Sequence, residues 1–311
     1  MKTKLAIGLG LLAMASLVLA LVVRTGESQP ANAPSSLRIG IYSPTVQFPT
    51  SGARMSYMRT LGSAIQTRTG IKVNVASYSS LGALRGARPD FAIVEGRCYA
   101  VNRRIGSLLA TARVGGGTTR TWALYSRLGN KLQSLKGRRL AVIGMGCNET
   151  AFVTNAMAAS EISRRYFSSI VRKPSLTAAV ADVATYKGAE AVFAPVGTQK
   201  GLTKVFTSGQ VPNPAFVQMN RGLPKAVANK VRSAVLSFGA SGAIGGWSAG
   251  RSGIYSSLAG RMGTRTYRGV FARPTPARVN VGDIVNKPKT LGDTKLTEVD
   301  QHFSNPPARQ Q

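Results

Sequence analysis

Two short stretches of the chain combine a carboxylate with a cysteine and with side chains that donate hydrogen bonds. They are Glu95, Cys98 and Tyr99 in the first stretch, and Cys147, Asn148, Glu149 and Thr150 in the second. A carboxylate can hold an amino group, whereas amide and hydroxyl groups donate to an oxyanion. Glycines precede the second stretch, and the free backbone N–H groups of a glycine turn that opens a helix also bind anions. These residue types predict noncovalent binding of a small ligand.

Cys98 and Cys147 are the two cysteines of the chain. In an oxidising compartment an even number of cysteines indicates a disulfide. Two buried thiols, or a redox- or metal-sensitive pair, are the alternatives that the sequence leaves open.

The sequence offers little for catalysis. The single histidine, His302, lies near the C-terminus, which excludes Ser-His-Asp and Cys-His arrangements in the body of the chain. Residues 37–271 contain six acidic side chains, too few to favour paired catalytic carboxylates. The turn Gly144-Met-Gly146 lacks the third glycine of a dinucleotide-binding loop, and one His with two Cys does not make a multi-ligand zinc site. We therefore expect a protein that is not an enzyme and that has no cofactor or metal.

Alternating strands and helices must position the two stretches. Apolar alternation predicts strands, and apolar residues at intervals of three and four predict helices. In the first half of the chain these patterns place strands at 37–42, 71–76 and 91–94 and helices at 54–70 and 80–86. This order predicts an α/β fold with mostly parallel sheets that are covered by helices.

The second half continues the alternation. The patterns predict strands at 122–125, 139–144, 189–194 and 216–219, a helical turn at 132–137, and helices at 149–167, 175–185 and 224–238, the first of them capped by Asn148. Ligands of open α/β sheets lie beyond the carboxyl ends of strands. That rule selects three loops: 42–45, 95–99 and 144–150.

Four segments, taken in order, resemble type II periplasmic solute-binding proteins, most closely the phosphate-, phosphite- and phosphonate-binding branch. Leu37–Tyr42 is similar to the opening strand before a ligand loop, and Pro89-Asp-Phe-Ala-Ile-Val-Glu95 to a strand that ends at the cleft. Leu132-Gln-Ser-Leu-Lys-Gly-Arg-Arg-Leu-Ala-Val-Ile-Gly144 resembles the widespread segment that opens the second lobe. Val211-Pro-Asn-Pro-Ala-Phe216, with the helix from Pro224, is similar to the return to the first lobe.

The resemblance spans residues 37–238 and implies two α/β lobes that close on a ligand. It implies a first lobe of residues 37–114 and 212–271 and a second lobe of residues 115–211. It also implies a small, phosphate- or phosphonate-like ligand and, as partners, the membrane subunits of an ABC-type importer. The ligand-binding residues expected on this basis are Tyr42, Ser43, Thr45, Glu95, Cys98, Tyr99, Thr119, Arg120, Cys147, Asn148, Glu149 and Thr150.

Two glutamates depart from the family pattern. Relatives that bind phosphonates carry Ser/Thr-rich residues where this chain has Asn148-Glu149-Thr150, and Glu149 already places a negative charge at the helix start. Glu95 ends a strand where the family often has a small or apolar residue. Its carboxylate is suited to a ligand's amino group or to a salt bridge with Arg97.

These departures favour a second hypothesis for the function. In it the protein is an extracytoplasmic sensor or scaffold that keeps the fold without taking part in transport. A disulfide between Cys98 and Cys147 would join the two lobes and hinder their opening. Such a bond conflicts with a binding protein that must open and close to take up and release its ligand.

The N-terminal segment indicates export. Lys2 and Lys4 precede an apolar run at residues 5–23, which is the layout of a secretory signal and is also long enough for an uncleaved membrane anchor. We expect residues 1–36 to be a signal or anchor with a linker, and the rest of the chain to be periplasmic or otherwise extracytoplasmic. Residues 272–311 are polar and rich in proline, which predicts an irregular tail.

The chain is strongly basic. Its 311 residues include 41 basic and 11 acidic side chains, for a net charge of +30 and a pI near 11.4. A hydrophobic content of 43% indicates a globular protein rather than a disordered one. Residues 37–271 hold 32 basic and six acidic side chains, so the charge is spread over both predicted lobes. A polyanion-binding surface protein is therefore a third hypothesis for the function. Dispersed charge fits adaptation of the whole surface to an acidic or polyanion-rich surrounding, with an anionic envelope surface as partner, better than a nucleic-acid-binding stripe, and an aromatic content of 7% is low for base stacking.

Overall fold

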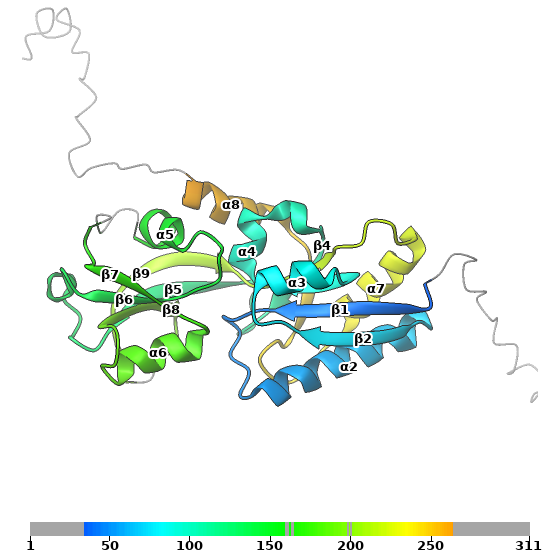
Figure 1. Ribbon diagram of the computed structural model, residues 1–311, viewed down its shortest axis with the longest axis horizontal. Coiled ribbons are helices and arrows are strands. Elements are labelled where there is room, and N and C mark those ends of the chain that lie inside the picture. Colours follow the sequence, from blue (N-terminus) through cyan, green and yellow to red (C-terminus); the bar gives the residue numbers. More distant parts are fainter. Residues whose placement is uncertain (1–33, 159–161, 163–164, 198, 200, 264–311) are drawn as a thin grey trace, which may run out of the picture. The chain divides into compact units, whose positions relative to one another are not determined.

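The computed structural model describes residues 34–263 except 159–161, 163–164, 198 and 200 (Figure 1). The expected signal or anchor, apart from the last residues of its linker, lies outside the described residues, as does the expected tail at 272–311. In the part of the chain that is described, no helix is long and apolar enough to cross a membrane.

Six strands form the first sheet, in the order β11-β4-β10-β3-β1-β2. Their bounds are Ser36–Tyr42 for β1, Lys72–Ser77 for β2, Phe91–Val94 for β3, Ser107–Arg113 for β4, Ala215–Gln218 for β10 and Gly246–Ala249 for β11. Strand β1 is parallel to both β2 and β3, whereas the pairings of β10 and β11 are antiparallel. We call this sheet and its covering helices the first lobe.

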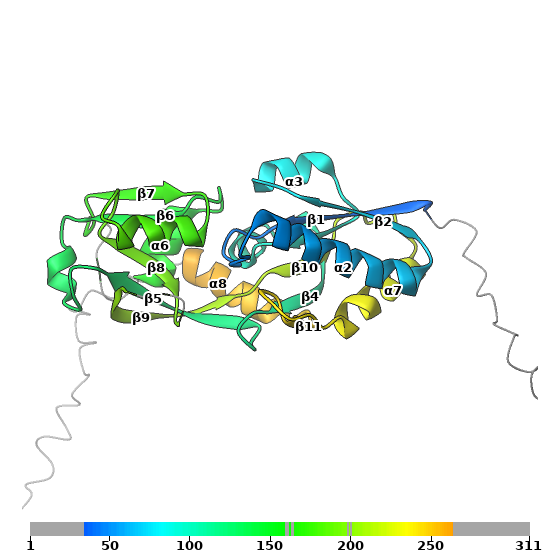
Figure 2. The same cartoon turned by 90° about the horizontal axis from the view of Figure 1, so that it is seen from below.

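Helices cover both faces of the first sheet. Helix α2 (Ser51–Thr69) and helix α7 (Lys225–Ser237) pack together over one face, and α3 (Leu81–Ala87) lies on the other (Figure 2). Strand β3 shows why its sequence is wholly apolar. Phe91 and Ile93 belong to the buried cluster that includes α2, whereas Ala92 and Val94 belong to the cluster that includes α3. A strand that is buried on both faces reads as a continuous apolar run.

Five strands form the second sheet, in the order β7-β6-β8-β5-β9. Their bounds are Thr119–Ser126 for β5, Arg139–Ile143 for β6, Ser169–Lys173 for β7, Ala191–Pro195 for β8 and Thr203–Pro212 for β9. Strand β6 is parallel to β7 and β8, whereas β5 is antiparallel to β8 and β9. Helix α6 (Leu176–Ala184) packs on this sheet, and we call the sheet and its helices the second lobe.

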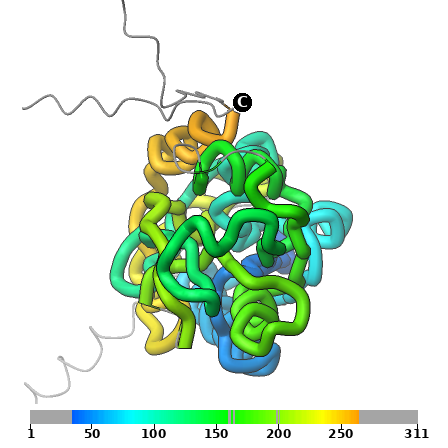
Figure 3. Tube along the Cα trace, turned by 90° about the vertical axis from the view of Figure 1, so that its left-hand side faces the viewer, coloured from blue at the N-terminus to red at the C-terminus, as the bar shows by residue number. Residues whose placement is uncertain are grey.

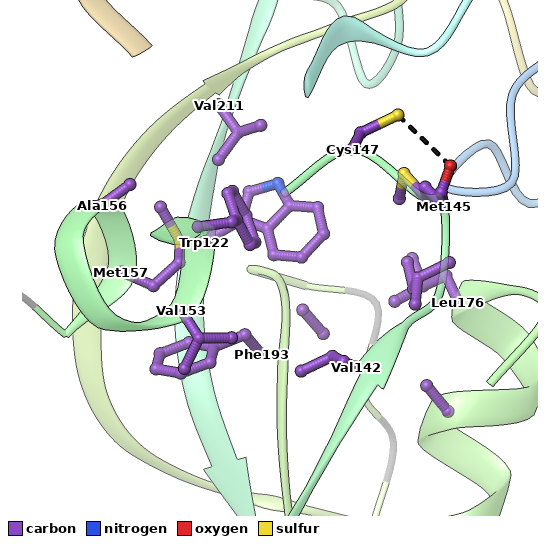
Figure 4. Close-up of a cluster of buried hydrophobic side chains, with 14 of the residues drawn as sticks. Trp122, Val142, Met145, Cys147, Val153, Ala156, Met157, Leu176, Phe193 and Val211 are labelled. Carbon is purple, nitrogen blue, oxygen red and sulfur yellow. Dashed lines mark hydrogen bonds between the residues drawn. The ribbon is translucent and has the colours of Figure 1, made fainter. Parts of the chain in front are cut away.

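The helix predicted over residues 149–167 is wrong in length and form. Helix α5 spans only Glu149–Ala151, a π-helix η4 continues it over Phe152–Met157, and Phe167 lies in a bend. The Ala158 amide donates to the Val153 carbonyl, five residues back, and this widens the turn. The wide turn buries Phe152, Val153, Ala156 and Met157, whose spacing is that of one face of a helix, but the helical segment ends at Met157. Val153, Ala156 and Met157 lie near Trp122 (Figure 4), and the Phe152 ring packs edge-on against the Trp122 ring.

Two chain crossings join the lobes, one between β4 and β5 and the other between β9 and β10. We call these two crossings the hinge. Asn213 fastens them to each other and is fully buried. Its Nδ2 donates to the Gly117 carbonyl at 2.7 Å, and its backbone amide donates to the Thr118 carbonyl at 2.9 Å.

The last helix of the described residues, α8 (Ser252–Gly263), which the sequence patterns did not predict, packs on both lobes. It contacts α4 (Gly96–Val101) of the first lobe and η4 of the second (Figure 3). Asn155 in η4 donates to the Met262 carbonyl at 2.8 Å, and the Tyr255 hydroxyl donates to the Asn213 carbonyl at 3.0 Å. Helix α8 is therefore a brace across the two lobes.

Candidate functional site

The loops after β1, β3 and β6 meet where the two lobes face each other. The Leu176 amide at the start of α6 donates to the Pro44 carbonyl at 3.1 Å, and Arg97 of α4 donates to the Ile143 carbonyl at 3.0 Å. Most of the residues expected to bind a ligand lie in these loops, but their side chains are buried: Tyr42, Ser43, Thr45, Glu95, Cys98, Tyr99, Cys147 and Glu149. The structure therefore brings them together in a filled interface between the lobes.

Glu95 is held by donors of the first lobe. Its Oε2 accepts from the hydroxyls of Ser43 at 3.1 Å and Thr45 at 2.7 Å, and from the Thr45 amide at 3.3 Å. Its Oε1 accepts from the Gly96 amide at 3.1 Å, and the residue is 1% exposed. Hydroxyl and amide donors of this kind are suited to a small oxyanion. Here the chain fills that position with its own carboxylate.

Glu149 is held in the same way by the loop that follows β6. Its Oε1 accepts from the Met145 amide at 2.6 Å and from the Cys147 amide at 3.2 Å. Gly146 (φ +67°) and Asn148 (φ +56°) both adopt left-handed backbone conformations, which curl the loop around the carboxylate. Burial acts to raise the pKa of Glu149, but backbone hydrogen bonds and the nearby Arg97 guanidinium outweigh it and lower the pKa. The carboxylate is therefore charged at neutral pH.

Arg97 reaches from α4 across the interface to this carboxylate. Its Nη2 lies 3.2 Å from Glu149 Oε1, and the two side chains are 3% and 10% exposed. The guanidinium also lies over the Phe152 ring, 4.7 Å from its centroid. The salt bridge suggested by the sequence, between Arg97 and Glu95, is wrong. Because α4 directs the guanidinium toward the second lobe, Arg97 pairs with Glu149.

A disulfide joins the lobes beside this ion pair. Cys98 of α4 and Cys147 of the loop after β6 are bonded, with their Cα atoms 5.1 Å apart. Both residues are buried, and neither of the chain's two cysteines is free. Cys147 Sγ lies 3.3 Å from the Met145 carbonyl oxygen, and Figure 4 shows these two residues together on the loop. Of the arrangements that the sequence left open, the structure has the disulfide.

Arg120 connects the hinge to the first carboxylate. Its Nη2 donates to Thr45 Oγ1 at 3.0 Å, its Nη1 to the Thr45 carbonyl at 3.3 Å, and its Nε to Asn213 Oδ1 at 2.8 Å. The same Thr45 hydroxyl donates to Glu95, so one hydroxyl separates the guanidinium from the carboxylate. Burial lowers the pKa of Arg120, and the charge of Glu95 opposes that change.

The two tyrosines expected at the site contribute to packing. Tyr42 is buried, and burial, followed by the charge of Glu95, raises the pKa of its phenol to about 12, against the opposing effect of Arg97. Tyr99 packs edge-on against Tyr255 of α8, with ring centroids 4.9 Å apart. Neither ring faces an open cleft, because both are at most 5% exposed.

The remaining expected residues lie at the margin of the interface. Asn148 and Thr150 are exposed. The prediction that Asn148 caps the helix by its side chain is wrong, because its left-handed backbone is not the extended conformation of a capping residue and its side chain makes no capping bond. Thr119 is partly exposed and lines a pocket beside the hinge.

That pocket, which we call the hinge pocket, has a volume of about 600 Å³. Its walls come from both lobes and from the crossing between them. They include Gln47, Val114, Arg120, Val196, Lys204 and Thr207. Among the described residues, no group of three or more His, Cys, Asp or Glu side chains is placed to hold a metal ion.

The chain is similar to solved protein structures, although its sequence matches none of the known families. No protein-family model and no curated protein sequence matches the chain. Among solved structures, a binding protein component of an ABC phosphonate transporter from Pseudomonas aeruginosa is similar with a TM-score of 0.54 at 15% identity, over 69% of this chain and 81% of that chain. PhnD1 from Prochlorococcus marinus (MIT 9301), in complex with methylphosphonate, is similar with a TM-score of 0.57 at 11% identity, over 73% and 97% of the two chains.

The fold is that of a type II periplasmic solute-binding protein. The predicted fold class is thereby confirmed. A Xanthomonas citri protein bound to ATP is also similar, with a TM-score of 0.53 at 12% identity, over 74% of this chain and 97% of that chain. At these identities the likeness establishes the fold alone.

The sequence did not predict which residues pair with the buried carboxylates between the lobes. The sequence pairs Arg97 with the wrong glutamate, and its patterns do not predict the link from Arg120 through Thr45 to Glu95. One signal was present: two of the six acidic residues in 37–271 fall in the predicted ligand loops. The sequence patterns do not predict β9, the strand that carries Lys204, and so do not place Lys204 near a site.

Proposed function

We propose that the protein is an extracytoplasmic binding protein whose lobes stay closed, and that it acts as a sensor or scaffold without taking part in transport. The observation that carries the proposal is the disulfide between Cys98 and Cys147, one residue in each lobe. A binding protein that serves an importer opens and closes by a hinge motion of its lobes. A covalent bond across the interface opposes that motion.

The buried carboxylates support the same proposal. Glu95 and Glu149 accept the hydroxyl and amide hydrogen bonds that an external oxyanion between the lobes would need. An incoming anion would have to displace them, and it would meet two negative charges at the interface. Helix α8 adds a brace between α4 and η4. We infer that the closed arrangement does not depend on a ligand at this interface.

The proposed compartment follows from chemistry. Disulfides persist in oxidising environments outside the cytoplasm, and the basic start with an apolar run at residues 5–23 is the layout of an export signal. The proposal does not include catalysis. All five acidic side chains of the described residues accept hydrogen bonds within the fold: Asp90, Glu95, Glu149, Asp182 and Glu190.

These internal carboxylates also bear on the partner. None of the five is exposed, so few negative charges offset the basic side chains at the surface. We therefore propose an anionic envelope surface as a partner that the charge distribution favours. Nucleic acid is disfavoured because the charge is dispersed and aromatic side chains are few.

A component of an ABC-type importer is the second candidate. It is favoured by the fold that the chain shares with the phosphonate transporter component and with PhnD1. In that function the lobes would close on a small, phosphate- or phosphonate-like ligand and would have to reopen. Reduction of the disulfide would then have to precede opening.

Small-angle X-ray scattering distinguishes the two candidates. The radius of gyration of the disulfide-bonded protein is measured with and without methylphosphonate and inorganic phosphate. A triple variant, Cys98→Ser, Cys147→Ser and Glu149→Lys, loses the disulfide and the Arg97–Glu149 ion pair between the lobes and serves as the opened reference. We expect one unchanged radius for the bonded protein. A decrease in the radius of gyration of the disulfide-bonded protein on addition of ligand would support the importer function and refute the proposal that the lobes stay closed.

A further inference from the structure

We propose that the hinge pocket is a binding site for a small organic anion, a compound that carries a carboxylate, phosphate or phosphonate group. The pocket is distinct from the interface between the strand-end loops, where Glu95 and Glu149 already occupy the anion positions. Its walls are formed by the crossing strands, by Gln47 after β1, by the end of β8 with Val196, and by the segment before β11. A ligand there does not have to displace an internal carboxylate.

Charge selects the class of ligand. Two of the lining residues, Arg120 and Lys204, are basic, and none of the lining residues is acidic. A guanidinium has five N–H groups. Three of those on Arg120 donate to Thr45 and Asn213, which leaves two for a ligand and holds the side chain in place. Lys204 is exposed at the pocket wall and supplies a second positive charge from β9.

Size and lining indicate an organic compound rather than an inorganic ion. A volume of about 600 Å³ lies within the range of small-molecule sites. Thr119 and Thr207 add hydroxyls to the wall, whereas Val114 and Val196 add apolar surface. A compound with an acidic group near the two cations and a small uncharged body against this surface matches these walls.

The inference rests on the proposed function, because residues of both lobes form the walls and the pocket keeps its shape only while the lobes stay closed. The two can still fail separately. Opening of the lobes is detected by scattering, whereas loss of the pocket's selectivity is detected by titration at an unchanged radius of gyration.

Isothermal titration of the disulfide-bonded protein tests the site. Glycerol 3-phosphate, succinate and inorganic phosphate are the anionic probes, and ethanolamine is the cationic control. Lys204→Glu reverses the charge at the pocket, and Lys187→Glu makes the same change at an exposed residue near the end of α6. Val196→Trp fills the pocket from a residue that is 45% exposed, so folding should be preserved. Arg120 is left intact because it also holds the hinge.

We expect glycerol 3-phosphate or succinate to bind, and ethanolamine to give no heat. Lys204→Glu should weaken that binding about tenfold or more, since a charge-assisted hydrogen bond is lost and a repulsion is added. Val196→Trp should abolish binding, and Lys187→Glu should leave it unchanged. Binding of phosphate that is equally strong in all three variants would mean that the ion associates with the basic surface in general, and would overturn the proposal. An absence of heat with every anion would overturn it as well.

Discussion

Substitution of Glu149 by glutamine should destabilise the protein far more than an equivalent substitution at the surface. The introduced amide has nearly the same shape as the carboxylate and can still accept from the Met145 amide, so the change removes mainly the negative charge. That charge is the counter-ion of Arg97, whose side chain is 3% exposed. A buried cation that loses its partner costs about 3–5 kcal/mol. Because the remaining hydrogen bonds are kept, we expect a loss near the lower end, about 3 kcal/mol.

Glu190→Gln provides the matched control. Glu190 pairs with Arg139 at 2.8 Å, but the Arg139 side chain is 46% exposed. An ion pair that is open to solvent contributes about 0–1 kcal/mol, so this variant should lie close to the wild type. Urea unfolding at neutral pH, followed by circular dichroism with the disulfide intact, gives both differences. If the two variants lost the same free energy of unfolding, the reasoning about the buried pair would be refuted.

The pH dependence supplies an independent test of the same pair. The pKa of Glu149 is lowered in the folded protein. Its contribution to stability is therefore fully present above its unfolded pKa, about 4.3, and is lost as the pH falls through the lower, folded value. The difference in unfolding free energy between wild type and Glu149→Gln should shrink as the solution is acidified through that range. A difference that stayed constant would contradict the assignment of a charged Glu149.

Three further predictions concern the disulfide, a buried phenol and a close backbone contact. Replacing both Cys98 and Cys147 by Ser should lower the free energy of unfolding by about 4 kcal/mol on the chain-entropy estimate for a separation of 49 residues, measured by the same urea titration; an unchanged value would argue against the bond. Tyr42→Phe should remove, from the ultraviolet alkaline titration, one phenol with a pKa of about 12, because burial disfavours its charged form. That phenol stabilises the fold below pH 10 and should cease to do so as the pH rises toward 12; loss of a phenol with an ordinary pKa would contradict its burial. Gly96→Ala should prevent stable folding, because a Cβ would lie 2.0 Å from the Pro212 carbonyl oxygen, whereas Gly86→Ala, with no atom within 4 Å, should raise the melting temperature slightly; equal melting temperatures would count against the tight packing of α4 on the hinge.

The sequence predicted elements best where local pattern and burial agree. The strand at 91–94 is wholly apolar and matches β3, because both of its faces are covered by helices. The predicted helix at 149–167 is wrong in form and length because apolar spacing specifies neither the backbone hydrogen-bond pattern nor the end of a helix. The buried residues of η4 are spaced as in a regular helix, yet the backbone forms a π-turn that ends at Met157. Helix α8 was missed although Tyr255, Leu258 and Met262 lie three and four residues apart, because the glycines and serines among them disfavour a helix.

The candidate site shows a different limit. Position at strand ends was enough to select the loops that contain Glu95, Glu149 and both cysteines. Which groups pair within those loops depends on the direction of each side chain and on the approach of the lobes, and neither can be read from a single sequence. Arg97 illustrates this, since Glu95 is closer along the chain but Glu149 is its partner in the fold.

The proposal that the lobes stay closed depends on the disulfide between them. A count of free thiols tests this bond most directly. The protein, produced with export to an oxidising compartment and purified without reductant, is denatured and treated with an alkylating reagent, and its peptides are examined by mass spectrometry. We predict no alkylated cysteine and a cross-linked peptide that joins Cys98 to Cys147. Two alkylated cysteines would show that the lobes are not joined and would contradict the account.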